Sequence, residues 1–195
     1  MSDIRSTMLS ALLSALGEQL AARGAHFHIV VIGGSGLLAL GLGDRATQDV
    51  DVVAFVENGG LVTARFTDAL AESASRVARD FGLQDRWLNP GPIPLLDVGD
   101  GLPAGFAERM ETVEYGRGLT ASFASRYDQI HLKLYAFASR QEPRDEADLV
   151  RLRPTADELH AAAQWARTHD MPGPFDGDLA DALRVFGVTD ARRDA

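Results

Sequence analysis

Two short apolar segments, each with polar residues at one end, constrain the fold of this chain more than any other feature. The first, at 28–32, runs directly into a Gly-Gly-Ser turn at 33–35, and the second, at 49–56, begins with Asp49 and Asp51. Both are rich in β-branched residues, which favours strands. The polar residues end one strand and begin the next, so they meet only if the two strands lie antiparallel. A right-handed βαβ crossover would separate them.

The Asp-x-Asp spacing predicts a pair of neighbouring carboxylates. Side chains two apart on a strand point to the same face, so we expect Asp49 and Asp51 to share a face with Val53 and Phe55. Aspartate is depleted in strands, and this pair interrupts an apolar run. Two adjacent carboxylates repel each other unless a cation lies between them. Mg²⁺, which takes one or two carboxylates together with substrate phosphates, fits that position.

The glycine-rich turn has two possible roles. Its backbone N–H groups suit a phosphate, especially where a helix begins, or the glycines and serine simply form a tight turn with a helix cap. A phosphate cradle beside metal-binding carboxylates would suit a nucleoside triphosphate. A competing pattern, G-x-G-x-x-A at 34–39, is typical of dinucleotide binding. In that motif the acidic residue ends the second strand, whereas here the aspartates begin it.

The remaining pattern predicts helices at 4–22, 35–42 and 62–81, a short strand at 87–89, one or two strands within 112–123, and helices from 127 onward. Thr155 followed by Glu158 fits a capping box. We expect two parts, residues 1–125 and a helical region at 126–195.

The composition indicates where the protein acts and which partners it favours. The chain has 195 residues, a formal net charge of −9 and no cysteine. No apolar run reaches the roughly 18 residues that a membrane span needs, and no signal peptide is evident. We therefore expect a cytoplasmic protein with no membrane partner. The acidic charge disfavours broad nucleic-acid binding, although a local basic groove remains compatible with it.

The only lysine of the chain, Lys133, lies on the predicted helix that begins near residue 127. It is either a phosphate-binding cation or a surface lysine whose stem covers apolar side chains. Asp145 and Asp148 follow Pro143, where acidic residues favour the first turn of a helix without any site role.

These motifs together resemble a known family. Residues 33–35, followed by Arg45-x-Thr47-x-Asp49-Val50-Asp51, resemble the polymerase-beta-like nucleotidyltransferase superfamily. The segments 87–89, 102–103, 132–136 with Arg140, and 144–149 are similar to the AbiEii-type and DUF6036 nucleotidyltransferases. The resemblance covers roughly residues 25–165.

The resemblance implies an α+β fold, with a nucleotidyltransferase-type mixed sheet flanked by helices and a helical C-terminal part. It implies transfer of an NMP from an NTP to an acceptor, tRNA or protein, in a toxin–antitoxin or defence setting in which an antitoxin could be a partner. Mg²⁺ is the implied cofactor, held by Asp49 and Asp51. The implied catalytic residues are Asp49, Asp51, Lys133 and Asp145, and the implied nucleotide-binding residues are Gly33, Gly34, Ser35, Arg45, Thr47 and Asp148.

One departure from the family pattern leaves an alternative open. Enzymes of this type commonly carry a third aspartate on a later strand, and the nearby acids here are Asp85, Asp97 and Glu114, of which Asp97 is the best candidate. If none serves, the chain is a catalytically inactive nucleotide-binding or partner-binding module of the same fold. A tRNA acceptor would also need a basic patch, for which the candidates are Arg126, Arg140, Arg144, Arg151 and Arg153.

Overall fold

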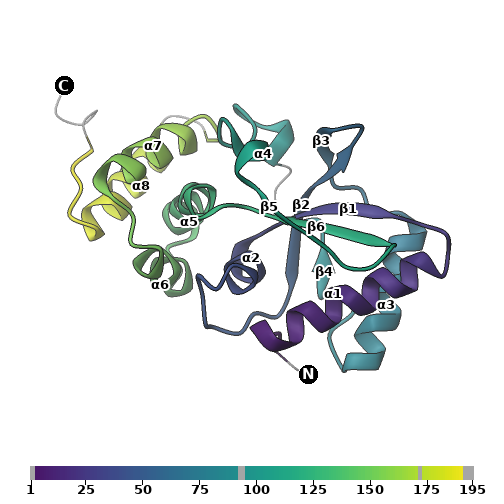
Figure 1. Ribbon diagram of the computed structural model, residues 1–195. Helices are drawn as coiled ribbons and strands as arrows, with labels where there is room; N and C mark the ends of the chain where they lie inside the picture. The colour runs from purple at the N-terminus through teal and green to yellow at the C-terminus, as the bar shows by residue number, and fades with distance from the viewer. Residues whose placement is uncertain (1–2, 92–94, 171–172, 191–195) are drawn as a thin grey trace. The chain divides into compact units, whose positions relative to one another are not determined.

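The computed structural model describes residues 3–91, 95–170 and 173–190 (Figure 1). The chain packs into two compact units, Met1–Leu96 with Gly105–Ser125, and Asp97–Ala104 with Arg126–Ala195. The expected α+β fold is confirmed, with a mixed sheet flanked by helices and a helical C-terminal part. The division at 125/126 into two domains stays a prediction. Residues 97–104 pack with the second unit.

The first unit is built on a six-stranded mixed sheet in the order β3-β2-β1-β6-β5, with β4 also pairing with β2. The strands are β1 (Phe27–Ile32), β2 (Val50–Glu57), β3 (Gly60–Thr63), β4 (Leu88–Asn89), β5 (Glu111–Glu114) and β6 (Leu119–Phe123). The predicted antiparallel pairing of the first two strands is confirmed. It is incompatible with the βαβ crossover that the dinucleotide-binding pattern requires.

A β-bulge in β2 changes which side chains share a face. Ile32 pairs with Asp51 and Ile29 pairs with Phe55, but the register shifts between Val30 and Val31. The shift leaves one extra residue in β2, and an extra residue reverses the alternation of side chains beyond it. Asp51 and Phe55 therefore lie on opposite faces, so the prediction that they share one was wrong.

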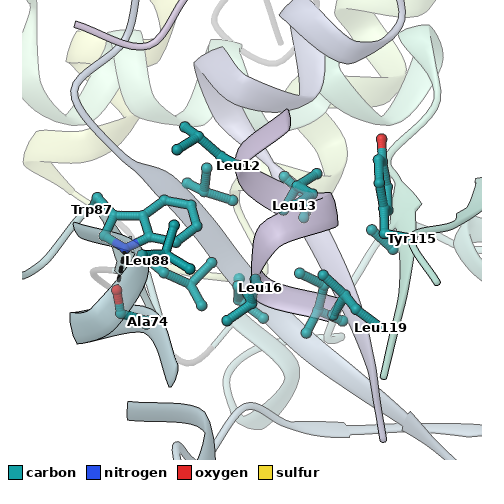
Figure 2. Packing of buried hydrophobic residues seen from close by; sticks show 14 of the residues in the cluster. Leu12, Leu13, Leu16, Ala74, Trp87, Leu88, Tyr115 and Leu119 are labelled. Carbon is teal, nitrogen blue, oxygen red and sulfur yellow. Dashed lines mark hydrogen bonds between the residues drawn. The ribbon is translucent and has the colours of Figure 1, made fainter. Parts of the chain in front are cut away.

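Two helices cover one face of this sheet. They are α1 (Ser6–Ala21) and α3 (Asp68–Phe81), and the same unit also contains α2 (Gly33–Ala39) and α4 (Phe106–Arg109). Leucines of α1 pack in one core with Leu119 of β6, Leu88 of β4 and Trp87, which precedes β4 (Figure 2). A Cβ built on Gly17 of α1 would lie 1.9 Å from the Tyr115 carbonyl oxygen. The helix thus rests directly on backbone.

The helix predicted at 62–81 begins later than expected. Residues 60–63 form β3, which pairs with β2 through a two-residue turn at Asn58-Gly59, where φ is 51° and 79°. An Asn-Gly pair with two positive φ angles is the preferred hairpin turn. The helix α3 then begins at Asp68, because the Thr67 hydroxyl accepts a hydrogen bond from the backbone N–H of Leu70 at 3.5 Å.

The second unit is helical. It contains α5 (Arg126–Arg140), α6 (Pro143–Leu152), α7 (Ala156–Ala166) and α8 (Pro174–Val185). A 3₁₀ turn at Leu95–Asp97 begins in the first unit and ends at the first residue of the second. The predicted capping box of Thr155 and Glu158 begins α7, with both of its hydrogen bonds formed. Within the part of the chain that the structure describes, no helix combines the length and the apolar character needed to cross a bilayer.

Candidate functional site

The Gly-Gly-Ser turn and the Asp-x-Asp segment come together at one end of the β1–β2 pair. Gly33 directly follows β1 with φ +71°, and a Cβ built on it would lie 3.1 Å from Asp51 Oδ2. The left-handed backbone favours glycine here, and a Cβ would press against this carboxylate. Asp51 itself is half-buried and faces the same side of the sheet as Ile32. The turn and the first carboxylate of β2 are therefore direct neighbours.

The second glycine lies against the loop that precedes β2. A Cβ on Gly34 would lie 3.2 Å from Thr47 Oγ1 and 3.8 Å from an Arg45 guanidinium nitrogen. Thr47 is held by paired backbone hydrogen bonds with Ile4, at 2.7 and 2.9 Å. Its hydroxyl donates to Asp49 Oδ1 at 3.3 Å. Gly34 and Asp49 are thus linked through a firmly held threonine.

The two aspartates could hold a magnesium ion only together with ligands that a bound substrate supplies. Among the described residues, no group of three or more histidine, cysteine or acidic side chains could hold a metal by itself. Asp49 and Asp51 supply hard carboxylate oxygens, and Mg²⁺ is commonly held by one or two carboxylates with substrate phosphates completing its shell. These two residues therefore suit a magnesium ion that arrives with a phosphate ligand.

Ser35 is placed differently from its glycine neighbours. It is 1% exposed, and its hydroxyl donates to the carbonyl of Ile32 at 3.3 Å. The hydroxyl proton is therefore engaged within the turn. A phosphate contact through Ser35 stays a prediction.

The residue next to Asp51 on the neighbouring strand is an asparagine rather than an acid. Asn89 of β4 pairs in register with Asp51. Asp85 is exposed in the turn before β4, Glu114 lies on β5 at the far edge of the sheet, and Asp97 belongs to the second unit. The sequence places Asn89 before Pro90 at the end of the predicted strand without giving it a site role, and the strand register is what puts it beside Asp51.

A line of hydroxyl and imidazole groups lies farther along the same face of the sheet. Ser122 Oγ is 2.8 Å from His28 Nε2 and 2.7 Å from the Thr112 hydroxyl, and Ser122 is fully buried. Burial, with a smaller contribution from His26, lowers the pKa of His28 below 6.5. The lowered pKa of His28 disfavours the charged imidazole at this position.

In the second unit, the three remaining predicted site residues form one buried ion cluster. Lys133 Nζ lies 3.1 Å from Asp145 Oδ1 and 2.7 Å from Asp148 Oδ2, and Arg140 donates to Asp145 Oδ2 at 2.7 Å. Lys133 is 8% exposed, Asp145 1% and Asp148 3%. The two cations and two anions balance within the unit. The roles of Lys133, Asp145 and Asp148 toward a nucleotide stay predictions.

Several of the arginines proposed as a basic patch have partners inside the second unit. Arg126 donates to both carboxylate oxygens of Glu158, at 2.6 and 3.2 Å, and to the carbonyls of Leu152 and Arg153. Arg140 pairs with Asp145 as described, and Arg144 pairs with Glu142. The charge of these three side chains is therefore balanced locally.

The sequence matches no protein-family model and no curated protein. Among solved structures, the chain is similar to an antigenic nucleotidyltransferase-like protein from Paracoccidioides brasiliensis. The two share 17% sequence identity over 94% of this chain and 91% of that chain, with a TM-score of 0.48.

Proposed function

We propose that this chain is a Mg²⁺-dependent nucleotidyltransferase that moves an NMP from an NTP to an acceptor hydroxyl. The observation that carries the proposal is the close approach of the glycine turn to the aspartates, with Gly33 beside Asp51 and Gly34 beside Thr47. Neither glycine carries a side chain, both are partly exposed, and both lie beside the segment that holds Asp49 and Asp51. A polyphosphate that brings its own divalent ion suits such a backbone turn.

Each residue of the turn and the loop has a task in this proposal. Asp49 and Asp51 would hold Mg²⁺, which neutralises phosphate charge when it is bound. Gly33 and Gly34 let the triphosphate approach the backbone closely. Thr47 orients Asp49 through its hydroxyl, and Arg45, beside Gly34, supplies a guanidinium for a phosphate oxygen.

The acceptor is a hydroxyl of tRNA or protein, and the biological setting is a toxin–antitoxin or defence system with a possible antitoxin partner. This part rests on the resemblance to the AbiEii-type group in residues 132–136 and 144–149. The net charge of −9 and the local pairing of Arg126, Arg140 and Arg144 weaken the support for tRNA. A protein acceptor is the better supported of the two.

A second candidate is a catalytically inactive module that binds a nucleotide or a partner. Asn89 favours it, because this neutral side chain occupies the position beside Asp51 where a third carboxylate would accept the proton of an attacking hydroxyl. Binding without transfer is the behaviour expected of such a module.

The deciding experiment incubates the purified chain with each α-³²P-labelled NTP, Mg²⁺ and total tRNA. The test variant is Asp49→Asn/Asp51→Asn, which keeps side-chain size, and the matched control is the exposed Asp85→Asn. Label on tRNA or on protein that only the test variant abolishes would support the transferase. Binding of Mg²⁺-NTP without transfer would favour the module. Absence of binding with every NTP would reject the transferase and the nucleotide-binding module, and would leave the partner-binding module.

A further inference from the structure

The short strand β4 is anchored to the start of β2, the segment that contains Asp51. The backbone N–H of Val50 donates to the carbonyl of Trp87 at 2.6 Å. Trp87 is fully buried, and its indole N–H donates to the Ala74 carbonyl at 2.9 Å (Figure 2). Leu88 is 4% exposed within the same core. Because both preceding residues are fixed in the core, packing holds the backbone of Asn89 in place.

Asn89 shares a sheet face with Asp51. The two residues are partners in the parallel β2–β4 register. Partners on neighbouring strands point to the same face, with the strands about 4.8 Å apart. On its other side Asp51 is paired with Ile32, which Gly33 follows. Asn89, Asp51 and the start of the glycine turn therefore form one row across the sheet.

The orientation of the Asn89 amide follows from one hydrogen bond. Its Oδ1 accepts from the backbone N–H of Gly91 at 2.8 Å. The intervening Pro90 has no N–H to offer, and a backbone N–H can only donate, so the oxygen must face Gly91. The amide nitrogen, with its two donors, then occupies the other side of the group. Donors suit an anion and not a metal ion.

We infer that Asn89 is a nucleotide-binding residue whose side-chain nitrogen donates to a phosphate oxygen of an NTP held beside Asp51. The inference rests on the proposed function. The neutral amide also suits the position electrostatically, because Asp49 and Asp51 already place two negative charges near the triphosphate. A third carboxylate would add repulsion against the phosphates.

Asn89→Asp separates this role from a role in the turn. Aspartate keeps an oxygen for the Gly91 N–H, but it replaces the donating nitrogen with a charged acceptor. The matched control is Asn58→Asp, at the only other asparagine of the sequence, in the β2–β3 turn. Binding of ATP, GTP, CTP and UTP, each with Mg²⁺, is measured by calorimetry on the full chain, together with the thermal midpoint.

We expect Asn89→Asp to weaken Mg²⁺-NTP binding at least about tenfold, the loss typical of a hydrogen bond to a charged group, with Asn58→Asp unchanged. Unchanged affinity in Asn89→Asp would reduce Asn89 to a turn cap and overturn the inference. Tighter binding would mean that the position faces the cation, and would also overturn it. If the unchanged protein binds no NTP, the proposed function fails and the inference fails with it.

A second measurement needs no substitution at Asn89. Labelling the chain with ¹⁵N-asparagine gives side-chain amide signals from Asn89 and Asn58 alone, and Asn58→Asp assigns them. Addition of Mg²⁺-NTP should shift the Asn89 NH₂ signals and leave those of Asn58 in place. Binding that leaves the Asn89 signals unmoved would overturn the inference while leaving the proposed function intact.

Discussion

Gly33 is under two constraints, one from its own backbone and one from a neighbouring side chain. Its φ of +71° lies in the left-handed region, and its Cβ position would be 3.1 Å from Asp51 Oδ2. Gly24, after α1, has a similar φ of +67° but nothing within 4 Å of its Cβ position. Comparing substitutions at Gly33 and Gly24 therefore separates the effect of the left-handed backbone from the effect of contact with Asp51.

Gly33→Ala and Gly24→Ala should each lose about 1–2 kcal/mol of unfolding free energy from the left-handed backbone. Only Gly33→Ala should also weaken Mg²⁺-NTP binding, because its methyl group displaces the Asp51 carboxylate. Urea unfolding measures the first effect and calorimetric titration the second. Equal nucleotide affinity in the two variants would argue against phosphate binding beside Gly33.

At the scale of elements, the contact between α1 and the sheet depends on small residues on both sides. A Cβ on Gly17 would meet the Tyr115 carbonyl at 1.9 Å, and a Cβ on Gly118, just before β6, would meet the Gly17 carbonyl at 2.2 Å. Backbone atoms cannot move aside as the end of a flexible side chain can. The helix is therefore seated closer to the sheet than any side chain at these positions would permit.

Gly17→Ala should destabilise the chain by about 1–3 kcal/mol, as expected for overpacking. Gly177→Ala, within α8, meets nothing within 4 Å and should stabilise the protein by about 0.5–1 kcal/mol through helix propensity. Chemical denaturation of both variants should give changes of opposite sign. A stabilising Gly17→Ala would contradict the close seating of α1.

The junction of α5, α6 and α7 depends on Arg126 and Glu158. Hydrogen bonds from Arg126 lower the pKa of Glu158 below 4.5, partly opposed by burial and reinforced by Thr155. A depressed carboxyl pKa contributes stability that is fully present above the unfolded value and is lost as the pH falls through the folded value. Glu158 therefore stabilises the fold above about pH 4.5 and contributes to acid unfolding below it.

Glu158→Gln keeps the capping box but removes the charge paired with Arg126, so it should lower the unfolding free energy at pH 7 by about 1 kcal/mol and flatten its fall below pH 4.5. Asp157→Asn, which alters an exposed acid in the same first turn, is the control. Thermal unfolding followed between pH 3 and 7 measures both. An acid profile of Glu158→Gln that parallels that of the unchanged protein would refute the assigned cause.

At the scale of the whole molecule, the two units hold their charged groups in different ways. In the first unit Asp49 and Asp51 are half-buried beside a glycine turn. In the second unit Lys133 is buried between two aspartates. Removing one partner of a buried ion pair strands the other charge and is strongly destabilising. Lys133 therefore has a measurable structural task, whatever its part in nucleotide binding.

Lys133→Met should lower the unfolding free energy by about 3 kcal/mol, since Asp148 loses its lysine and Asp145 keeps only Arg140. Arg184→Met, which breaks the exposed pair with Asp181, should cost less than about 1 kcal/mol. Thermal unfolding compares them. A stable Lys133→Met that has lost NTP binding would instead support the phosphate-binding role.

Local sequence patterns were enough for several features of the fold. The glycines after one strand and the aspartates before the next predicted the antiparallel pairing, and Thr155 with Glu158 predicted the start of α7. The predicted start of the helix at 62–81 is wrong, because Asn58-Gly59 forms a hairpin turn that makes 60–63 a strand instead of only ending β2. The predicted alternation of side chains between the two faces of β2 is wrong beyond Val53. The cause is a β-bulge, which depends on pairing with β1.

The sequence by itself determined which residue types stand where the first two strands end and begin, because Gly33 and Gly34 directly follow one apolar run and Asp49 and Asp51 open the next. Only the tertiary structure decided which residues from distant parts of the sequence lie beside one another. Asn89 reaches Asp51 through β4, and Lys133 meets Asp148 across two helices. Such contacts arise from the packing of whole elements, and packing leaves no local pattern from which they could be predicted.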